Sequence, residues 1–187
     1  MVGQLLLNLP NSLALFRILL APLMVYVLIT PELLTDRGFH ESWVTYTAGL
    51  LFVIASVTDF FDGYIAREWD QKTELGAILD PLADKMLVIG AFLGLLLIGE
   101  ASIWAIYIIL IRELFISGLR IIGISKGIDV SASWSGKIKT VVQMFAIGFL
   151  VMGWSYGTEL LWFSVFLTVY SAVEYILAYG KAIKIKK

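Results

Sequence analysis

Stretches of mostly apolar residues recur along the whole chain, separated by short polar connections. A membrane helix needs about 20 such residues, and these stretches are of that order. We therefore expect an all-α, polytopic membrane protein forming a single domain over 1–187. The short apolar segment before the first stretch, around Leu5 to Leu7, is expected to be an N-terminal interfacial segment. The six predicted transmembrane helices are at about 12–30, 43–67, 76–98, 102–124, 136–153 and 160–180.

Composition supports the membrane class. Of the 187 residues, 59% are hydrophobic and only 16% are charged, whereas soluble domains carry about 25% charged residues. Cysteine is absent, which excludes disulfides, thiolate metal ligands and cysteine nucleophiles. The single histidine, His40, lies in a polar connection and argues against histidine catalysis or a zinc site.

The basic residues lie predominantly on one side of the predicted membrane. The chain has 14 Lys and Arg. Ten fall in the second and fourth connections, at their margins or in the tail, and Arg37 alone is on the opposite side. The other three, Arg17, Lys85 and Arg112, lie within or near predicted helices. The positive-inside rule then places both termini in the cytoplasm. The membrane is expected to be the cell inner membrane. The Lys-rich tail is expected to contact anionic lipid headgroups, and no nucleic acid partner is expected.

Four aspartates lie at the predicted cytoplasmic ends of the second and third helices. Asp59 and Asp62 are three residues apart, and Asp80 and Asp84 are four apart, so each pair shares one helix face. The connection between the helices is short, which predicts antiparallel neighbours with their acidic ends facing each other. Carboxylates are expensive in a membrane and are the ligands that hard divalent cations prefer. The four together are enough for two such cations.

Small residues and an arginine accompany these acids. Gly63, Ala66 and Gly76 are expected to leave open space where a flat base or a diphosphate approaches the backbone. Arg67 has a guanidinium that can donate two hydrogen bonds to a phosphate. This combination favours phosphoryl transfer from an anionic diphosphate donor, which at the inner leaflet can be a lipid.

Local structural roles compete with this interpretation. Asn11-Ser12 is a candidate cap for the first helix. Asp80 can cap a helix that starts at Pro81, or Pro81 can lie inside a continuous helix and bend it. Asp84 can pair with a neighbouring cation. The four acids can also serve a divalent-cation transporter, and a purely structural membrane subunit is the remaining alternative.

A second group of charged residues follows in the fourth and fifth predicted helices. It forms a basic pocket suited to a small phosphorylated acceptor, and its members are Arg112, Arg120, Lys137 and Lys139. The two lysines can equally be ordinary positive-inside charges. Arg112 can be paired structurally with Glu113 or with Asp84. Glu174, in the last helix, has no partner that the sequence identifies.

The aspartate stretch resembles the complete signature of the CDP-alcohol phosphotransferase family. It reads Asp59-x-x-Asp62-Gly63-x-x-Ala66-Arg67, eight residues, then Gly76-x-x-x-Asp80-x-x-x-Asp84. All eight signature positions agree, without a departure in spacing. The six predicted helices are also similar in number to the family's fold.

This resemblance implies a reaction and a role for each residue. Members carry out a one-step displacement on a CDP-linked donor, and they are homodimers. The cofactors would be two divalent cations, Mg²⁺ or Mn²⁺, and Asp84 would also take the acceptor's hydroxyl proton. The implied metal ligands are Asp59, Asp62, Asp80 and Asp84. The implied CDP-binding residues are Gly63, Ala66, Arg67 and Gly76. The implied acceptor-phosphate residues are Arg112, Arg120, Lys137 and Lys139.

Motifs outside the signature bear on the substrates. They include Asn8-Leu9-Pro10-Asn11 with Arg17, Arg112-Glu113-Leu114, and Gly136-Lys137-Ile138-Lys139-Thr140. They are similar to motifs of family members that use CDP-diacylglycerol as donor and glycerol 3-phosphate as acceptor. Inositol phosphate, serine and phosphatidylglycerol stay open as alternative acceptors.

Overall fold

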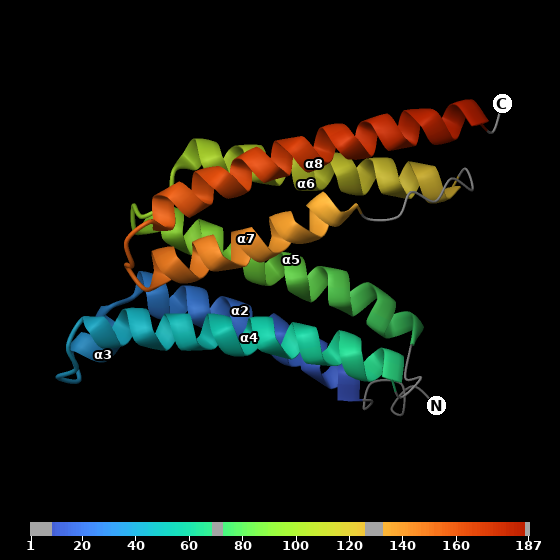
Figure 1. Ribbon diagram of the computed structural model, residues 1–187. Helices are drawn as coiled ribbons and strands as arrows, with labels where there is room; N and C mark the ends of the chain where they lie inside the picture. Colours follow the sequence, from blue (N-terminus) through green and yellow to red (C-terminus); the bar gives the residue numbers. More distant parts are fainter. Residues whose placement is uncertain (1–8, 69–72, 126–132, 186–187) are drawn as a thin grey trace. The chain divides into compact units, whose positions relative to one another are not determined.

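The structure is a computed structural model that describes residues 9–68, 73–125 and 133–185 (Figure 1). In these ranges it has seven helices and no strand. The side chains of 60–68, 74, 77, 184 and 185 lie outside what it describes. The helices are α2 (Leu9–Ile29), α3 (Glu32–Thr35), α4 (Ser42–Glu68), α5 (Glu74–Leu97), α6 (Ile103–Ser125), α7 (Trp134–Val151) and α8 (Gly157–Ile185).

The predicted all-α class is confirmed, and each of the six predicted segments is a helix with ends within about five residues of those expected. The four-residue α3 was not predicted, because a single polar turn carries no hydrophobic period. Within the described residues, two helical segments are long and apolar enough to cross a membrane, Leu9–Ile29 and Gly157–Ile183. Membrane crossing by all six stays a prediction.

Two of the local expectations are settled by the helix ends. Asn11 is not the cap of α2, because the helix already includes Leu9 and Pro10, and Asn11 is buried inside it. Asp80 is not a cap either, since α5 runs continuously from Glu74 to Leu97 with Pro81 inside it. The cap of α5 is Thr73, whose hydroxyl accepts a hydrogen bond of 2.9 Å from the backbone N–H of Gly76.

The chain divides into two compact units. One comprises Met1–Glu100 and Ile147–Trp154, and the other Ala101–Ala146 and Ser155–Lys187. The first unit thus contains α2 to α5 and the end of α7, whereas the second contains α6, most of α7 and α8. A single domain over 1–187 stays a prediction.

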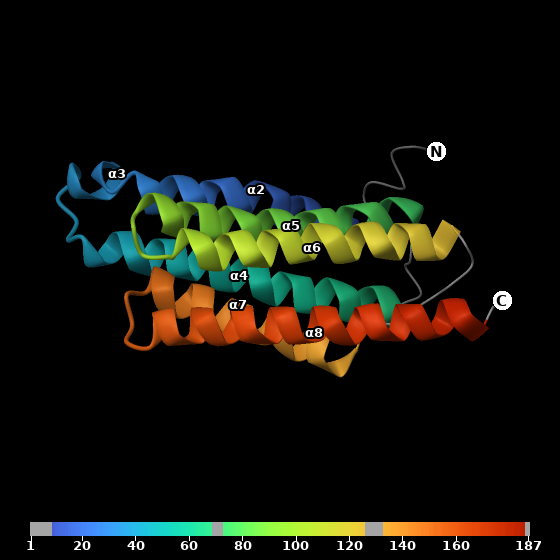
Figure 2. The same cartoon turned by 90° about the horizontal axis from the view of Figure 1, so that it is seen from above.

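In the first unit, α2 is the central packing element. It packs along both α4 and α5, whereas α4 and α5 have little contact with each other (Figure 1, Figure 2). The expected neighbours α4 and α5 do contact each other, but most of their packing is against α2. Small residues let the helices approach closely: a Cβ added to Gly94 of α5 would lie 3.1 Å from Leu28 Cδ2 of α2. Side chains on α2 are thus placed to contact acids of both partner helices.

In the second unit, α6 packs along α8, and α7 is joined to both by polar contacts. Ile116 of α6 is buried against Tyr175 and Tyr179 of α8. Gln143 of α7 donates a hydrogen bond of 3.1 Å to the Thr168 hydroxyl of α8, and both side chains are buried. A buried polar pair of this kind fixes the register of two apolar helices.

Candidate active site

The acidic residues of the signature lie on α4 and α5 of the first unit. Asp59 and Asp80 have half-buried side chains, exposed by 34% and 42% respectively. Asp84 is also half-buried. Asp62 belongs to α4, but its side chain lies outside the described residues, and the same holds for Gly63, Ala66 and Arg67.

Arg17 of α2 brings the first acid of each helix together. Its side chain is completely buried, and it forms an ion pair with Asp59 of α4. Its Nη2 lies 3.9 Å from Oδ1 of Asp80 on α5. One guanidinium therefore contacts carboxylates from both helices, so that Asp59 and Asp80 lie at the same end of the unit, on either side of Arg17.

The donor set suits a hard divalent cation. Oδ1 of Asp80 is buried and accepts no hydrogen bond from any residue that the structure describes, although such a buried oxygen normally has a partner. Among the described side chains no three acids or histidines are grouped closely enough to hold a metal, and Asp62 is not among these side chains. Carboxylate oxygens with a vacant acceptor site are what Mg²⁺ or Mn²⁺ requires.

Gly76 lies where α2 meets the start of α5. The Thr73 hydroxyl donates a hydrogen bond of 3.0 Å to Oδ1 of Asn11 while it caps α5. A Cβ at Gly76 would lie 2.8 Å from Asn11 Oδ1 and 3.1 Å from Thr73 Oγ1. The side-chain space beside Gly76 was expected to be open, but Asn11 and Thr73 occupy it. The glycine is required here because Asn11 packs directly against it.

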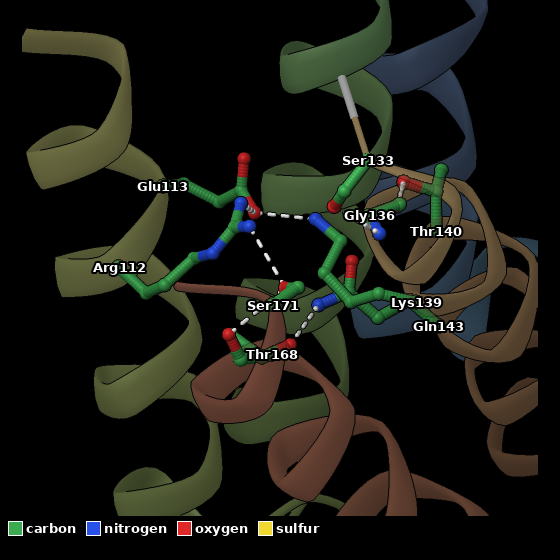
Figure 3. Close-up of polar contacts among 9 residues, drawn as sticks. All are labelled: Arg112, Glu113, Ser133, Gly136, Lys139, Thr140, Gln143, Thr168 and Ser171. Carbon is green, nitrogen blue, oxygen red and sulfur yellow. Dashed lines mark hydrogen bonds and ion pairs between the residues drawn. The ribbon is translucent and has the colours of Figure 1, made fainter. Parts of the chain in front are cut away.

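The second charged group forms a network in the second unit (Figure 3). Glu113 of α6 accepts hydrogen bonds from Arg112 Nη1, at 3.0 Å, and from Lys139 Nζ, at 2.5 Å. Arg112 Nη2 donates to the Ser171 hydroxyl of α8 at 2.8 Å. Of the two structural partners left open for Arg112, it pairs with Glu113. Figure 3 shows Arg112 and Lys139 approaching Glu113 from different helices.

The two cations of this network are largely removed from solvent. The side chain of Arg112 is 13% exposed and that of Lys139 is 6% exposed. Nε of Arg112 is buried and has no hydrogen-bond partner among the described residues. Buried cations with one shared carboxylate retain donor capacity for an anionic ligand.

The structure does not bring all four predicted acceptor residues together. Arg120 is exposed on α6. Lys137 is exposed on α7, with its ammonium 5.4 Å from the centre of the Trp134 ring, in a cation–π contact. Arg112 and Lys139 are therefore the buried pair of the group. Glu174, which had no identified partner, accepts a hydrogen bond from the Ser135 hydroxyl.

Sequence reasoning assigned no role in the site to Arg17, and it assigned Asn11 only a role as a helix cap. A signal for Arg17 was present, because an ionisable residue inside a membrane helix requires a partner of opposite charge. Arg17 lies near the start of the first predicted helix, at the cytoplasmic level expected for the aspartates. Asn11 gave no such signal, because its contact with Thr73 joins residues 62 positions apart.

Comparison with known proteins adds an independent observation. The sequence model described as CDP-alcohol phosphatidyltransferase matches residues 7–170. A Bacillus subtilis protein named CDP-diacylglycerol–glycerol-3-phosphate 3-phosphatidyltransferase is 37% identical over 191 aligned positions, covering 95% of this chain and 97% of its own length. An Escherichia coli protein of the same name is 37% identical, covering 91% and 94%. A Mycobacterium tuberculosis protein named probable phosphatidylglycerophosphate synthase is 37% identical, covering 90% and 80%.

Proposed function

Because the chain belongs to the CDP-alcohol phosphatidyltransferase family, we propose that it transfers a phosphatidyl group from CDP-diacylglycerol to sn-glycerol 3-phosphate. The products are phosphatidylglycerophosphate and CMP, so the chain is an enzyme of phospholipid biosynthesis. The observation that carries this proposal is the complete aspartate signature, whose Asp59 and Asp80 meet around one buried guanidinium. The printed names of relatives similar over nearly the whole chain support the choice of acceptor.

The reaction is a single displacement at phosphorus. The acceptor hydroxyl oxygen bonds to the phosphorus that carries diacylglycerol, and the bond from that phosphorus to the bridging oxygen breaks. The bridging oxygen leaves with CMP, and the hydroxyl proton passes to the carboxylate of Asp84. Asp84 suits this role because it is a half-buried acid one helical turn from Asp80 on α5.

The cofactors of the proposed enzyme are two divalent cations, Mg²⁺ or Mn²⁺. When bound, they would clamp the donor's diphosphate and neutralise the charge that develops on CMP. Asp59 and Asp80, which meet around Arg17, and Asp84, on the same face of α5, support this proposal. The ligands would be Asp59, Asp62, Asp80 and Asp84.

The donor's nucleotide would lie beside α4 and the start of α5. Gly63, Ala66 and Arg67 follow Asp59 on α4, and we assign them to the CDP pocket. Gly76 contributes its backbone there, while its missing side chain makes room for Asn11. The acyl tails would stay in the bilayer.

The acceptor's phosphate would be held by Arg112 and Lys139, with Arg120 and Lys137 contributing from more exposed positions. Glu113 keeps the two buried cations oriented, and the vacant Nε of Arg112 is a donor for a phosphate oxygen. A doubly charged phosphate ester fits such a pair better than a zwitterion such as serine.

The proposed setting is the inner membrane, with six helices crossing it and the termini and active site cytoplasmic, in a homodimer. Two helical segments of membrane-spanning length and hydropathy support the membrane setting. The one-sided distribution of Lys and Arg along the sequence supports the orientation.

CMP release from CDP-diacylglycerol tests the proposed function. The purified full chain, with Mg²⁺ or Mn²⁺, is given glycerol 3-phosphate, inositol phosphate, serine or phosphatidylglycerol in parallel. We expect release with glycerol 3-phosphate to exceed release with any other acceptor. Faster release with another acceptor would overturn the acceptor, and no release with any of them would overturn the reaction.

A further inference from the structure

Arg17 is a fully buried cation and the only charged residue of α2. It forms ion pairs with two signature acids, Asp59 on α4 and Asp80 on α5. α2 packs along both of these helices, so that its side chains reach both. Removing a guanidinium from water is expensive, and a protein keeps one in its interior only where carboxylates compensate it.

The two acids also require Arg17. Without a cation, neighbouring carboxylates in a half-buried site repel each other, and the helices that carry them are pushed apart. The planar guanidinium has several N–H donors and reaches one acid with Nη1 and the other with Nη2. A lysine ammonium is a single point of charge and does not span two carboxylates in this way.

We propose that Arg17 is a positioning residue that acts as the built-in counter-cation of the carboxylate site. It holds Asp59 and Asp80 beside one guanidinium before a divalent cation arrives. This inference rests on the proposed function, since it takes the two acids as metal ligands. Arg17 is assigned to act through the two carboxylates that it contacts.

The arrangement leaves room for the metal. Two carboxylates carry one more charge than a single guanidinium neutralises. Asp80 Oδ1 lies 3.9 Å from Arg17 Nη2, beyond hydrogen-bond distance, and it has no hydrogen-bond partner among the described residues. Arg17 therefore aligns the acids without saturating them, and a divalent cation can occupy the remaining acceptor position.

This role makes a specific prediction about stability. In Arg17→Met, the acids lose their counter-cation, so the metal-free protein is destabilised. A divalent cation restores the missing positive charge, and the variant is therefore stabilised by metal more than the parent is. An arginine that only anchored helices would lower stability by the same amount with and without metal.

The measurement is the unfolding temperature of the full chain in detergent, with EDTA and with Mn²⁺. Arg17→Met is expected to unfold at least about 5 °C below the parent in EDTA, and Mn²⁺ is expected to close most of that gap. Arg37→Met is the matched control, because Arg37 is exposed in the connection after α3. It is expected to follow the parent in both conditions.

Two further variants keep the test decisive if Arg17→Met does not fold. Arg17→Lys keeps the charge without the planar group. Its deficit in unfolding temperature in EDTA should be smaller than that of Arg17→Met, and Mn²⁺ should reverse it equally. The double variant Asp59→Asn with Arg17→Met loses one charge of each sign. Its unfolding temperature in EDTA should therefore lie closer to that of the parent than the unfolding temperature of Arg17→Met does. A deficit of Arg17→Lys that Mn²⁺ leaves unchanged would overturn the inference. If Mn²⁺ restores the unfolding temperature of the variant but the parent releases no CMP, only the proposed reaction is overturned.

Discussion

The two charged regions of the molecule have opposite arrangements of charge. In the first unit, acids from α4 and α5 gather around one buried cation, Arg17. In the second unit, cations from α6 and α7 gather around one carboxylate, Glu113. Among the described ion pairs, two charges of one sign thus share one charge of the other sign in each region.

The difference lies in what each excess can bind. The acidic region has a vacant carboxylate oxygen on Asp80, which suits a cation. The basic region has a vacant N–H on Arg112, which suits an anion. In the proposed reaction the first region therefore performs the chemistry, and the second selects the acceptor. Changes in the first should lower kcat, and changes in the second should raise KM for the acceptor.

Asp84→Asn should have the largest effect. The asparagine cannot accept the hydroxyl proton, and loss of a general base lowers turnover by about 10²- to 10⁴-fold. Loss of a metal ligand adds to this. We expect CMP release to fall by at least that factor, while binding of CDP-diacylglycerol persists in a thermal-shift assay.

The control for this variant is Asp36→Asn, since Asp36 is exposed in the connection after α3. It should turn over at the parent rate. Asp84→Asn turning over near the parent rate would remove Asp84 from the chemistry and break the assignment of catalysis to the first region.

Arg112→Met should have a smaller effect of a different kind. Hydrogen bonds to charged groups contribute about 1.5–3 kcal/mol, which corresponds to roughly 10- to 150-fold in kcat/KM. The loss should fall on KM for glycerol 3-phosphate, with KM for CDP-diacylglycerol unchanged. Glu113 keeps Lys139 as a partner, so the variant leaves no isolated buried charge.

Arg120→Met sharpens this prediction within the same helix. Arg120 is exposed, and an exposed cation interacts more weakly because water screens it. Its KM increase should be smaller than that of Arg112→Met, and Lys181→Met, at the exposed end of α8, should match the parent. An Arg120 effect larger than the Arg112 effect would place acceptor recognition at the surface of the unit.

The sequence predicted the helices well because long apolar stretches determine them directly. It also predicted a continuous α5 as one of two alternatives for Pro81. It misjudged Asn11, since asparagine is a common helix cap and local patterns cannot reveal a bond to Thr73, the cap of α5. It predicted α4 and α5 as neighbours, and they do contact each other, but chain connectivity did not reveal that α2 packs along both.

The candidate site was predictable as a set of residues and not as a set of contacts. Helical spacing put Asp80 and Asp84 on one face, and the family signature named them. The ion pairs with the opposite charges could not be predicted from the sequence, because Arg17 is 42 residues from Asp59, and Lys139 is 26 from Glu113. The opposite charges that complete each region therefore come from tertiary structure, which a linear pattern does not record.

Gly76→Ala should have the smallest effect, on stability. Its Cβ would lie 2.8 Å from Asn11 Oδ1, and overpacking of this kind costs about 1–3 kcal/mol. The unfolding temperature should fall by roughly 2–10 °C. Gly118→Ala, in α6 of the second unit, is the matched control, because nothing lies within 4 Å of the added Cβ. It should be neutral or slightly stabilising, since alanine favours helix.

Asn11→Ala determines whether the clash is the cause. The shorter side chain gives up the bond from Thr73 but makes room for a Cβ at Gly76. The double variant Asn11→Ala with Gly76→Ala should therefore be no less stable than Asn11→Ala alone, a non-additivity expected only of residues in contact. Additive losses, or equal effects of Gly76→Ala and Gly118→Ala, would mean that close packing of α2 does not explain the glycine. The space beside it would then be available to the nucleotide, as first expected from the sequence.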